Sequence, residues 1–172
     1  MICKKYSVSQ PLRDALLLTV TLTIGTICHA DQTCKRDLIT SSSTTDSFLP
    51  GEAGNNEAIV VDTKSGLMWM RCSLGQTWDG KTCNDFPSNH SWEDALKKAE
   101  AHEYAGYSDW RLPNKNELVS SMEVSCVKPS INLDIFPSTP ISFYWSSTPF
   151  KAILNQAWAV NFNNGFISNE LK

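Results

Sequence analysis

Apolar residues follow a strand-like pattern in the middle and at the end of the chain. Residues 58–62 and 67–71 are rich in apolar and β-branched residues, and a short polar turn ending in Gly66 separates them. This pattern predicts a β-hairpin in which Gly66 adopts a positive φ. Later runs of the same character predict three further strands, at residues 143–147, 156–162 and 166–168.

Two other segments have helical spacing. From Trp92 onward, apolar residues recur at positions i, i+3, i+4 and i+7, and Ser91 is a suitable N-cap. This spacing predicts a helix that ends near Glu103 and buries its apolar side. A second, shorter helix is expected at residues 115–122, because Asn114 and the glutamate three positions later can form a capping box.

The segment between these helices enters the second one through Pro113. Trp110 and Leu112 form its apolar face, and Asp109 and Arg111 alternate with them. Proline restricts the residue before it, so Leu112 is expected to be extended. We expect Trp110 and Leu112 to lie in the core. Asp109 and Arg111 are expected to form a structural ion pair or to bond neighbouring loops.

Residues 31–56 show no apolar period and contain a Ser/Thr run at residues 41–45. This composition predicts a linker or a loosely attached N-terminal arm, tied to the rest of the chain if Cys34 forms a disulfide. Residues 57–172 are predicted to form one α+β domain, within which residues 124–141 are a long irregular stretch.

The first 30 residues have the parts of a secretory signal peptide. Basic residues precede an apolar run at residues 15–27, and Cys28-His29-Ala30 follows it. We expect cleavage after Ala30, with no stable membrane span afterwards, because the run is shorter than the roughly 20 residues that a spanning helix needs. An uncleaved anchor and lipid attachment at Cys28 are the alternatives. The expected location is the periplasm, or the cell surface after secretion.

Charge gives no reason to expect a nucleic-acid partner. The whole chain has 15 basic and 18 acidic residues, and residues 1–30 hold three of the former and one of the latter. The processed chain therefore has 12 basic and 17 acidic residues, a net charge of −5. Its adjacent basic pairs, Lys35-Arg36 and Lys97-Lys98, read as solvated surface rather than as a polyanion site.

Cysteine usage suggests an oxidising compartment. The processed chain would keep an even number of cysteines, which are Cys34, Cys72, Cys83 and Cys126. The preferred pairing is Cys72–Cys83 with Cys34–Cys126, and the two other pairings remain open. A zinc site is disfavoured, because there is no C-x-x-C motif and neither His90 nor His102 has ligand spacing. We expect no metal and no cofactor.

Several short motifs then occur in a fixed order along residues 58–168. They are Asp62 to Trp69, Arg71 to Trp78 with Cys83, Trp92 to Ala95, Ser108 to Pro113, Phe136-Pro137, Tyr144 to Ser147, and Trp158 to Phe162 with Gly165. In this order they resemble the C-terminal domain family of the Legionella collagen-like adhesin. The positions expected to be structural are Trp69, Trp92, Asp109, Trp110, Arg111, Leu112, Pro113, Trp145 and Trp158. Members of that family usually end with a further strand bearing a Val-Arg pair, so the resemblance implies that the last strand is missing here.

The same order of elements looks like the C-type-lectin-like fold that formylglycine-generating enzymes share. The resemblance implies an α+β fold with two helices and short antiparallel strands, stapled by disulfides. The Glu-Pro-Asn and Trp-Asn-Asp triplets of calcium lectins are absent, so calcium-dependent sugar binding is not supported.

These features favour an exported, non-catalytic module that binds a glycan or an envelope or surface protein. Aromatic faces stack on sugars and short polar side chains hold hydroxyls, so the candidate ligand residues are Trp78, Asn84, Asp85, Asn163 and Asn164. The competing interpretations are packing for Trp78 and turn chemistry for Asn163 and Asn164. At least four tryptophans, Trp69, Trp92, Trp110 and Trp145, are expected in the core.

Two other functions are compatible with the sequence. The first is a structural or assembly subunit of the envelope that forms homo-oligomers, such as a trimer. The second is an enzyme of the formylglycine-generating kind, which is less favoured because no cysteine lies in a matching context. His90 and His102 also lack a recognisable partner, so no catalytic residue is assigned.

Overall fold

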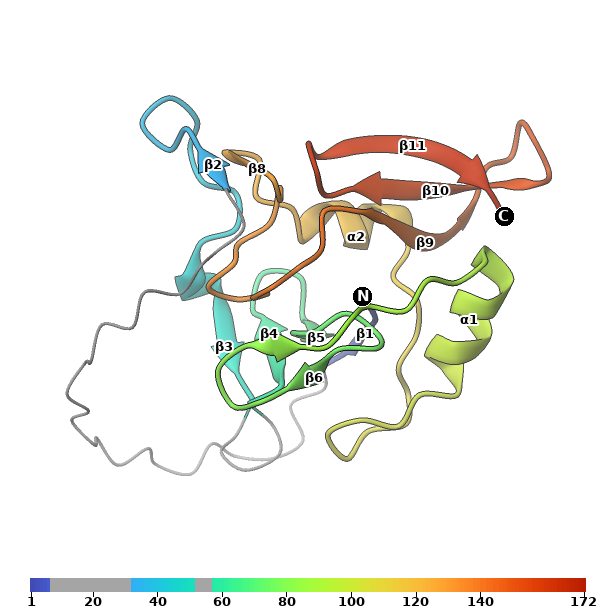
Figure 1. Ribbon diagram of the computed structural model, residues 1–172, viewed down its shortest axis with the longest axis horizontal. Coiled ribbons are helices and arrows are strands. Elements are labelled where there is room, and N and C mark those ends of the chain that lie inside the picture. Colours follow the sequence, from blue (N-terminus) through green and yellow to red (C-terminus); the bar gives the residue numbers. More distant parts are fainter. Residues whose placement is uncertain (7–31, 52–56) are drawn as a thin grey trace.

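The computed structural model describes residues 1–6, 32–51 and 57–172. In this part of the chain, helices α1 and α2 lie beside the two larger antiparallel sheets (Figure 1). The larger sheet has the strand order β1-β5-β4-β3, and the smaller has the order β11-β10-β9. Helix α1 (Trp92–Glu100) contacts β9, and helix α2 (Lys115–Ser120) contacts β9 and β10. The protein is therefore of the mixed α+β class, as the sequence predicts.

The predicted hairpin forms the middle of the larger sheet. It consists of β4 (Ile59–Asp62) and β5 (Leu67–Met70), and Gly66 has a φ of 66° in the turn. On the outer sides, β3 (Phe48–Pro50) pairs with β4 and β1 (Cys3–Lys5) pairs with β5. Every residue of β4 and β5 is buried.

The larger sheet separates two apolar clusters. Val60 and Trp69 face the first cluster, whereas Ile59 and Met68 face the second. Successive side chains of a strand point to opposite faces of the sheet. Because both faces are covered, β4 and β5 read as continuous apolar runs rather than as alternating ones.

Both helices begin at the caps that the sequence predicts. The Ser91 hydroxyl accepts a hydrogen bond from the Asp94 backbone N–H at 3.2 Å. Asn114 and Glu117 form the predicted capping box, in which each side chain accepts a bond from the other residue's backbone N–H. Helix α1 buries small side chains such as Ala95 in the second cluster. Both helices end slightly earlier than predicted.

The smaller sheet confirms the three C-terminal strands. They are β9 (Phe143–Pro149), β10 (Gln156–Asn161) and β11 (Phe166–Leu171). Gly165, with a φ of 73°, allows the tight turn between β10 and β11. Every residue of β11 is at least partly exposed, because β11 lies at the edge of this sheet.

Both predicted disulfides are present. Cys34–Cys126 joins β2 (Thr33–Cys34) to β8 (Cys126–Val127), which also pair as strands. Cys72–Cys83 closes the loop that contains β6 (Thr77–Trp78) and β7 (Cys83–Asn84), with 5.5 Å between the two Cα atoms. The first disulfide anchors the irregular stretch at residues 124–141, as expected.

Residues 41–50 pack against the domain, which corrects the expectation of a linker or loosely attached arm over residues 31–56. The Ser43 backbone N–H donates to Glu123, a short 3-10 turn (Thr45–Ser47) follows, and Phe48 enters the first cluster. Polar groups that suggested a solvated linker, such as the Ser42 hydroxyl and the Ser43 backbone N–H, are hydrogen-bonded within the protein, whereas the buried Ser43 hydroxyl has no partner among the described residues. Residues 31 and 52–56 lie outside the described part of the chain.

Glu123 is the acceptor at the centre of this contact and is fully buried. Its carboxylate accepts bonds from the backbone N–H groups of Ser42, Ser43 and Ser125 and from the hydroxyls of Ser41 and Ser125. Burial alone would raise the pKa of this carboxyl group. The hydrogen bonds from Ser41, Ser125 and Ser43 outweigh burial and lower the pKa from 4.5 to about 2.

Two of the four tryptophans expected in the core lie at its margin. Trp69 and Trp110 are fully buried, as predicted. Trp92 and Trp145 are only half-buried. The indole N–H groups of both donate to backbone carbonyl oxygens, so each ring is held at the boundary between its apolar neighbours and polar backbone.

The predicted signal peptide falls only partly within the described residues. Its first six residues include β1, whereas residues 7–31, with the apolar run and Cys28, lie outside them. Among the helices that the structure describes, none has the length and apolarity needed to cross a membrane.

The buried Glu123 carboxylate predicts a pH-dependent stability. Because its pKa is lower in the folded chain, its contribution is fully present above about pH 4.5 and disappears as the pH falls toward 2. By linkage the loss is roughly 3 kcal/mol of unfolding free energy. Urea unfolding at pH 7, 4 and 2.5 should show this loss for the wild type and a smaller one for Glu123→Gln. Parallel pH curves for the two proteins would contradict the assignment.

The core placement of Trp110 predicts a second difference in stability. Trp110→Ala should lower the unfolding free energy by about 3–5 kcal/mol, because it empties a fully buried site. Lys97→Ala should change it little, since the exposed Lys97 makes only a surface ion pair with Glu93. Thermal melts of both variants test this contrast, and similar melting temperatures would show that the core is misassigned.

Candidate functional site

Three of the five predicted ligand residues lie in or next to the loop closed by Cys72–Cys83: Trp78 is inside it, and Asn84 and Asp85 directly follow Cys83. Trp78 lies on β6 and is half-buried, while Asn84 and Asp85 are exposed. Outside the disulfide, the Thr82 hydroxyl lies 2.9 Å from the Ser138 hydroxyl and ties the loop to the irregular stretch. The loop therefore presents these side chains from a fixed position.

Trp78 has one ring face covered by Arg71. The guanidinium carbon lies 4.3 Å from the ring centroid, within the range of a cation–π contact. Arg71 is itself fixed, because its Nε and Nη2 donate to the carbonyl oxygens of Ile135 and Asp134 at 2.8 and 2.9 Å. Any sugar that stacks on this indole must use the opposite face.

Asp79 organises the turn between β6 and β7. Its carboxylate accepts bonds from the backbone N–H groups of Thr82 and Lys81 and from the Asn84 side chain, each at 2.8 Å. These bonds, with that from Thr82 the strongest, lower the pKa of Asp79. One amide N–H of the Asn84 side chain is thus used within the turn. Its side-chain carbonyl oxygen remains available for a ligand. Asp85 sits next to it with a φ of 67°.

A shallow depression of about 370 Å³ adjoins the exposed part of Trp78. We call it the Trp78 surface. Its lining combines an aromatic ring, two cations and one carboxylate. The residues that contribute to it are Pro50, Glu57, Arg71, Trp78, Gly80 and Lys81.

Asn163 and Asn164 do not join this surface. They form the β10–β11 turn, where the Asn164 side chain accepts a bond from the Phe166 backbone N–H and the Asn163 carbonyl accepts one from Lys128. Figure 1 shows this turn beside β8, well separated from β6. The predicted ligand set therefore splits into two regions, because asparagine in a turn serves the local backbone.

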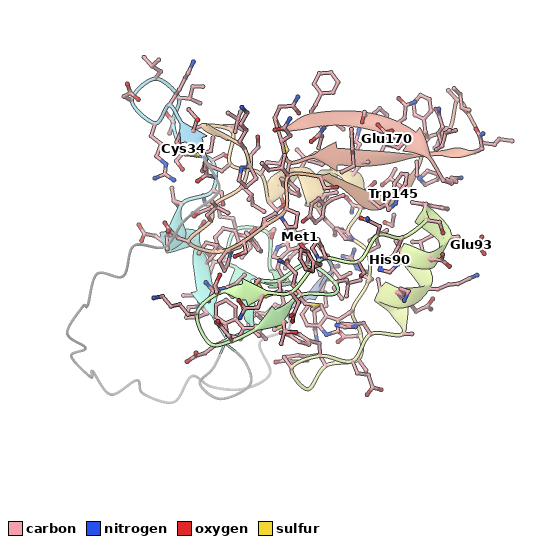
Figure 2. The ribbon with its side chains drawn as sticks, in the orientation of Figure 1. Met1, Cys34, His90, Glu93, Trp145 and Glu170 are labelled. Carbon is pink, nitrogen blue, oxygen red and sulfur yellow. A yellow bond between two sulfur atoms is a disulfide. The ribbon has the colours of Figure 1, made fainter. Side chains whose placement is uncertain are left out.

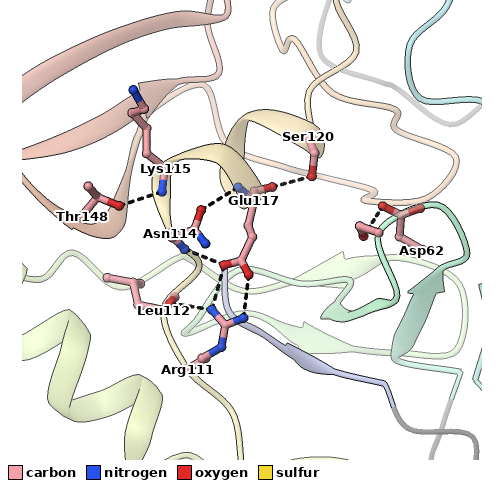
Figure 3. Close-up of polar contacts among 9 residues, drawn as sticks. Asp62, Arg111, Leu112, Asn114, Lys115, Glu117, Ser120 and Thr148 are labelled. Atoms are coloured by element: carbon pink, nitrogen blue, oxygen red, sulfur yellow. Dashed lines mark hydrogen bonds and ion pairs between the residues drawn. The ribbon is translucent and has the colours of Figure 1, made fainter.

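The extended segment that leads through Pro113 into α2 is held to this helix by a bidentate ion pair (Figure 3). Arg111 Nη1 and Nη2 donate to the two carboxylate oxygens of Glu117 at 2.8 and 2.7 Å. The bond from Arg111 lowers the pKa of Glu117, and the reciprocal bond raises that of Arg111. Glu117 also accepts from the Asn114 backbone N–H at 2.7 Å. Both carboxylate oxygens of Glu117 are thus bonded within the fold, which indicates a structural role for the pair.

Asp109 does not pair with Arg111, which settles the choice left open by the sequence. Alternating residues of an extended segment share one face, but here Arg111 turns to α2. Asp109 forms an ion pair with Lys4 of β1 instead. Pro113 is buried and its carbonyl accepts from the Ser147 backbone N–H at 2.8 Å.

Trp158, the last of the predicted structural positions, is half-buried on β10. The Lys115 ammonium group lies 4.6 Å from its ring centroid, and the Phe150 ring meets it edge-on at 5.1 Å. Trp158 therefore resembles Trp78 in burial and in having a cation over its ring, but it lies in the other sheet.

A second cavity, of about 130 Å³, lies between the start of the chain and the region of His90 and Trp145 (Figure 2). Sequence reasoning gave His90 no partner, yet its Nε2 lies 2.7 Å from the Ser88 hydroxyl. A serine two residues before a histidine is common in sequences, so Ser88 alone does not predict a hydrogen bond to His90. Burial is the main cause of a lowered pKa for His90, and the positive charge of Lys98 is the next. The lowered pKa favours the neutral imidazole.

The Ser88–His90 pair lacks the carboxylate that would complete a catalytic triad. Among residues 1–6, 32–51 and 57–172, no carboxylate hydrogen-bonds His90, and no three His, Cys, Asp or Glu side chains are grouped as metal ligands. The Ser88 hydroxyl also contacts the Leu74 carbonyl at 3.1 Å. The geometry fits a local structural bond.

The chain was compared with known families, curated proteins and solved structures. Neither a curated protein nor a solved structure matches it. The model of the Lcl C-terminal domain matches residues 58–172, which cover both sheets except β1 and β3, both helices and the Trp78 loop. The chain belongs to the Lcl C-terminal domain family.

Proposed function

We propose that this protein is an exported, non-catalytic binding module that recognises a glycan or an envelope or surface protein. The observation that carries the proposal is the family match over residues 58–172. The motifs in that segment resemble the C-terminal domain of a collagen-like adhesin, and adhesins act by binding. A C-type-lectin-like architecture is part of the same proposal and rests on the resemblance alone.

Export is supported by the two disulfides. Cys34–Cys126 and Cys72–Cys83 join segments 92 and 11 residues apart. Disulfides of this structural kind persist outside the reducing cytosol. The basic and apolar segments of residues 1–30 have the features of a secretory signal peptide, which would direct the protein to the periplasm or the cell surface.

The Trp78 surface is the proposed binding site. Arg71 packs on one indole face and the half-buried ring lines the depression, so the ring is pre-positioned and loses little freedom on binding. Lys81 supplies a polar contact in the same depression, and Asn84 lies on the adjacent strand β7. The same combination suits sugar stacking and the aromatic anchoring of a protein partner.

A structural or assembly role in the envelope is the second candidate, and β11 favours it. This edge strand exposes Phe166 and Leu171, each to 66%, beside the partly exposed Ile167. An edge strand with exposed apolar side chains is a template for pairing with another copy. Light scattering or native mass spectrometry decides: a trimer would support this role, and a monodisperse monomer would oppose it.

Substitution of Trp78 tests the proposed site. Trp78→Ala should weaken binding by about tenfold or more, as loss of an aromatic anchor does. Trp158→Ala is the matched control, because Trp158 is also half-buried under a cation and should leave binding unchanged. The exported protein is applied to arrays of neutral and acidic glycans and to immobilised envelope fractions. Prior protease treatment of the fractions separates protein targets from glycans.

Two results would oppose the proposal. One is the absence of binding above background on every array and fraction. The other is an equal loss of binding in Trp78→Ala and Trp158→Ala, which would indicate a general effect on folding. Circular dichroism of both variants verifies that each retains the fold.

A further inference from the structure

Strand β1 occupies a groove between two other segments. On one side it pairs with β5, with Cys3 opposite Trp69. On the other side it meets Arg111: the Cys3 N–H donates to the Arg111 carbonyl at 3.0 Å, and the Arg111 N–H donates to the Cys3 carbonyl at 2.9 Å. Figure 3 shows the blue β1 ribbon passing beside Arg111. We call the space that β1 fills the strand groove.

The side chains of β1 complete both apolar clusters. Ile2, just before β1, is fully buried in the second cluster beside Met68, and Cys3 is fully buried in the first cluster beside Trp69. Without them, each cluster would be open along the edge of β5. The backbone groups of Arg111 and β5 would also lose their partners, which is costly at a buried position.

Lys4 gives the strand groove a charge preference. It is almost fully buried as a residue, pairs with the Asp109 carboxylate, and its ammonium group lies 3.7 Å from the Tyr107 ring centroid. Asp109 and Tyr107 therefore form a receptor for a cation at this position of the strand. A carboxylate there would face Asp109 directly.

The start of the chain fits the strand groove less well. Burial lowers the pKa of the Met1 amino group to about 5, because a charged terminus is unfavourable there. An internal segment of a polypeptide would place a neutral amide at the same point. The groove thus suits the middle of an extended chain better than a free amino terminus.

We propose that, once residues 1–30 are removed, the strand groove is an acceptor site for an extended segment of another polypeptide that carries two apolar residues followed by a lysine. This inference rests on the proposed export, since cleavage after Ala30 takes β1 away. Recognition combines main-chain pairing on both sides with the apolar pockets of Ile2 and Cys3 and the Lys4 receptor. The partner thereby becomes part of the fold, and the groove is distinct from the Trp78 surface.

The test uses the processed protein purified from the exporting cell, whose intact mass shows whether residues 1–30 are absent. The probe is an acetylated, fluorescein-labelled peptide with the sequence of residues 1–6, in which Cys3→Ala prevents oxidation. Fluorescence anisotropy should show saturable binding. Hydrogen exchange at the backbone N–H groups of Arg111 and Met70 should slow on binding, because in the structure they donate to the carbonyl oxygens of Cys3 and Ile2.

Charge reversal gives the control. A Lys4→Glu peptide should bind about tenfold or more weakly, and Asp109→Lys in the protein should restore its binding. Glu93→Lys, an equally acidic to basic change on the exposed side of α1, should leave both affinities unchanged.

Several results would overturn the inference. They are an exported protein that retains Met1, a peptide that does not bind, and equal affinities for the Lys4 and Lys4→Glu peptides. None of them bears on the glycan and envelope assays with Trp78→Ala, so the two proposals fail separately.

Discussion

Burial of the β4–β5 hairpin on both faces is the constraint on which the rest of the structure depends. A hairpin with Ile59 and Met68 on one side and Val60 and Trp69 on the other is stable only when both sides are covered. Helix α1 and the Trp110 segment cover one side; α2, the irregular stretch and the smaller sheet cover the other.

Local chemistry explains which parts of the fold could be predicted. Ser91 and the Asn114–Glu117 capping box act over three residues, and the turn at Gly66 needs only one backbone conformation, so each leaves a readable signal. The contacts that were missed join distant parts of the chain. Glu123 binds serines about 80 residues away, and nothing in a Ser/Thr run shows that a buried carboxylate will organise it.

The candidate site was less predictable, for a related reason. Composition indicated an aromatic with polar neighbours, and Trp78 and Asn84 do share one loop. The value of Trp78 as a binding surface depends on which ring face Arg71 covers, and that follows from carbonyl oxygens in the stretch after Ile131. Asn163 has the same side-chain chemistry as Asn84 but lies in the β10–β11 turn of another sheet, and the sequence alone does not show how far apart two hairpins lie in the fold.

The Cys34–Cys126 disulfide encloses just over half of the chain, including the loop closed by Cys72–Cys83 and strands β3, β4 and β5 of the larger sheet. A protease that cuts once anywhere between these cysteines would leave two pieces still joined by a covalent bond. The nicked molecule would keep its pieces at high effective concentration and could hold its shape. If the protein is exported as proposed, one backbone cut would then not by itself separate the Trp78 surface from the rest of the molecule.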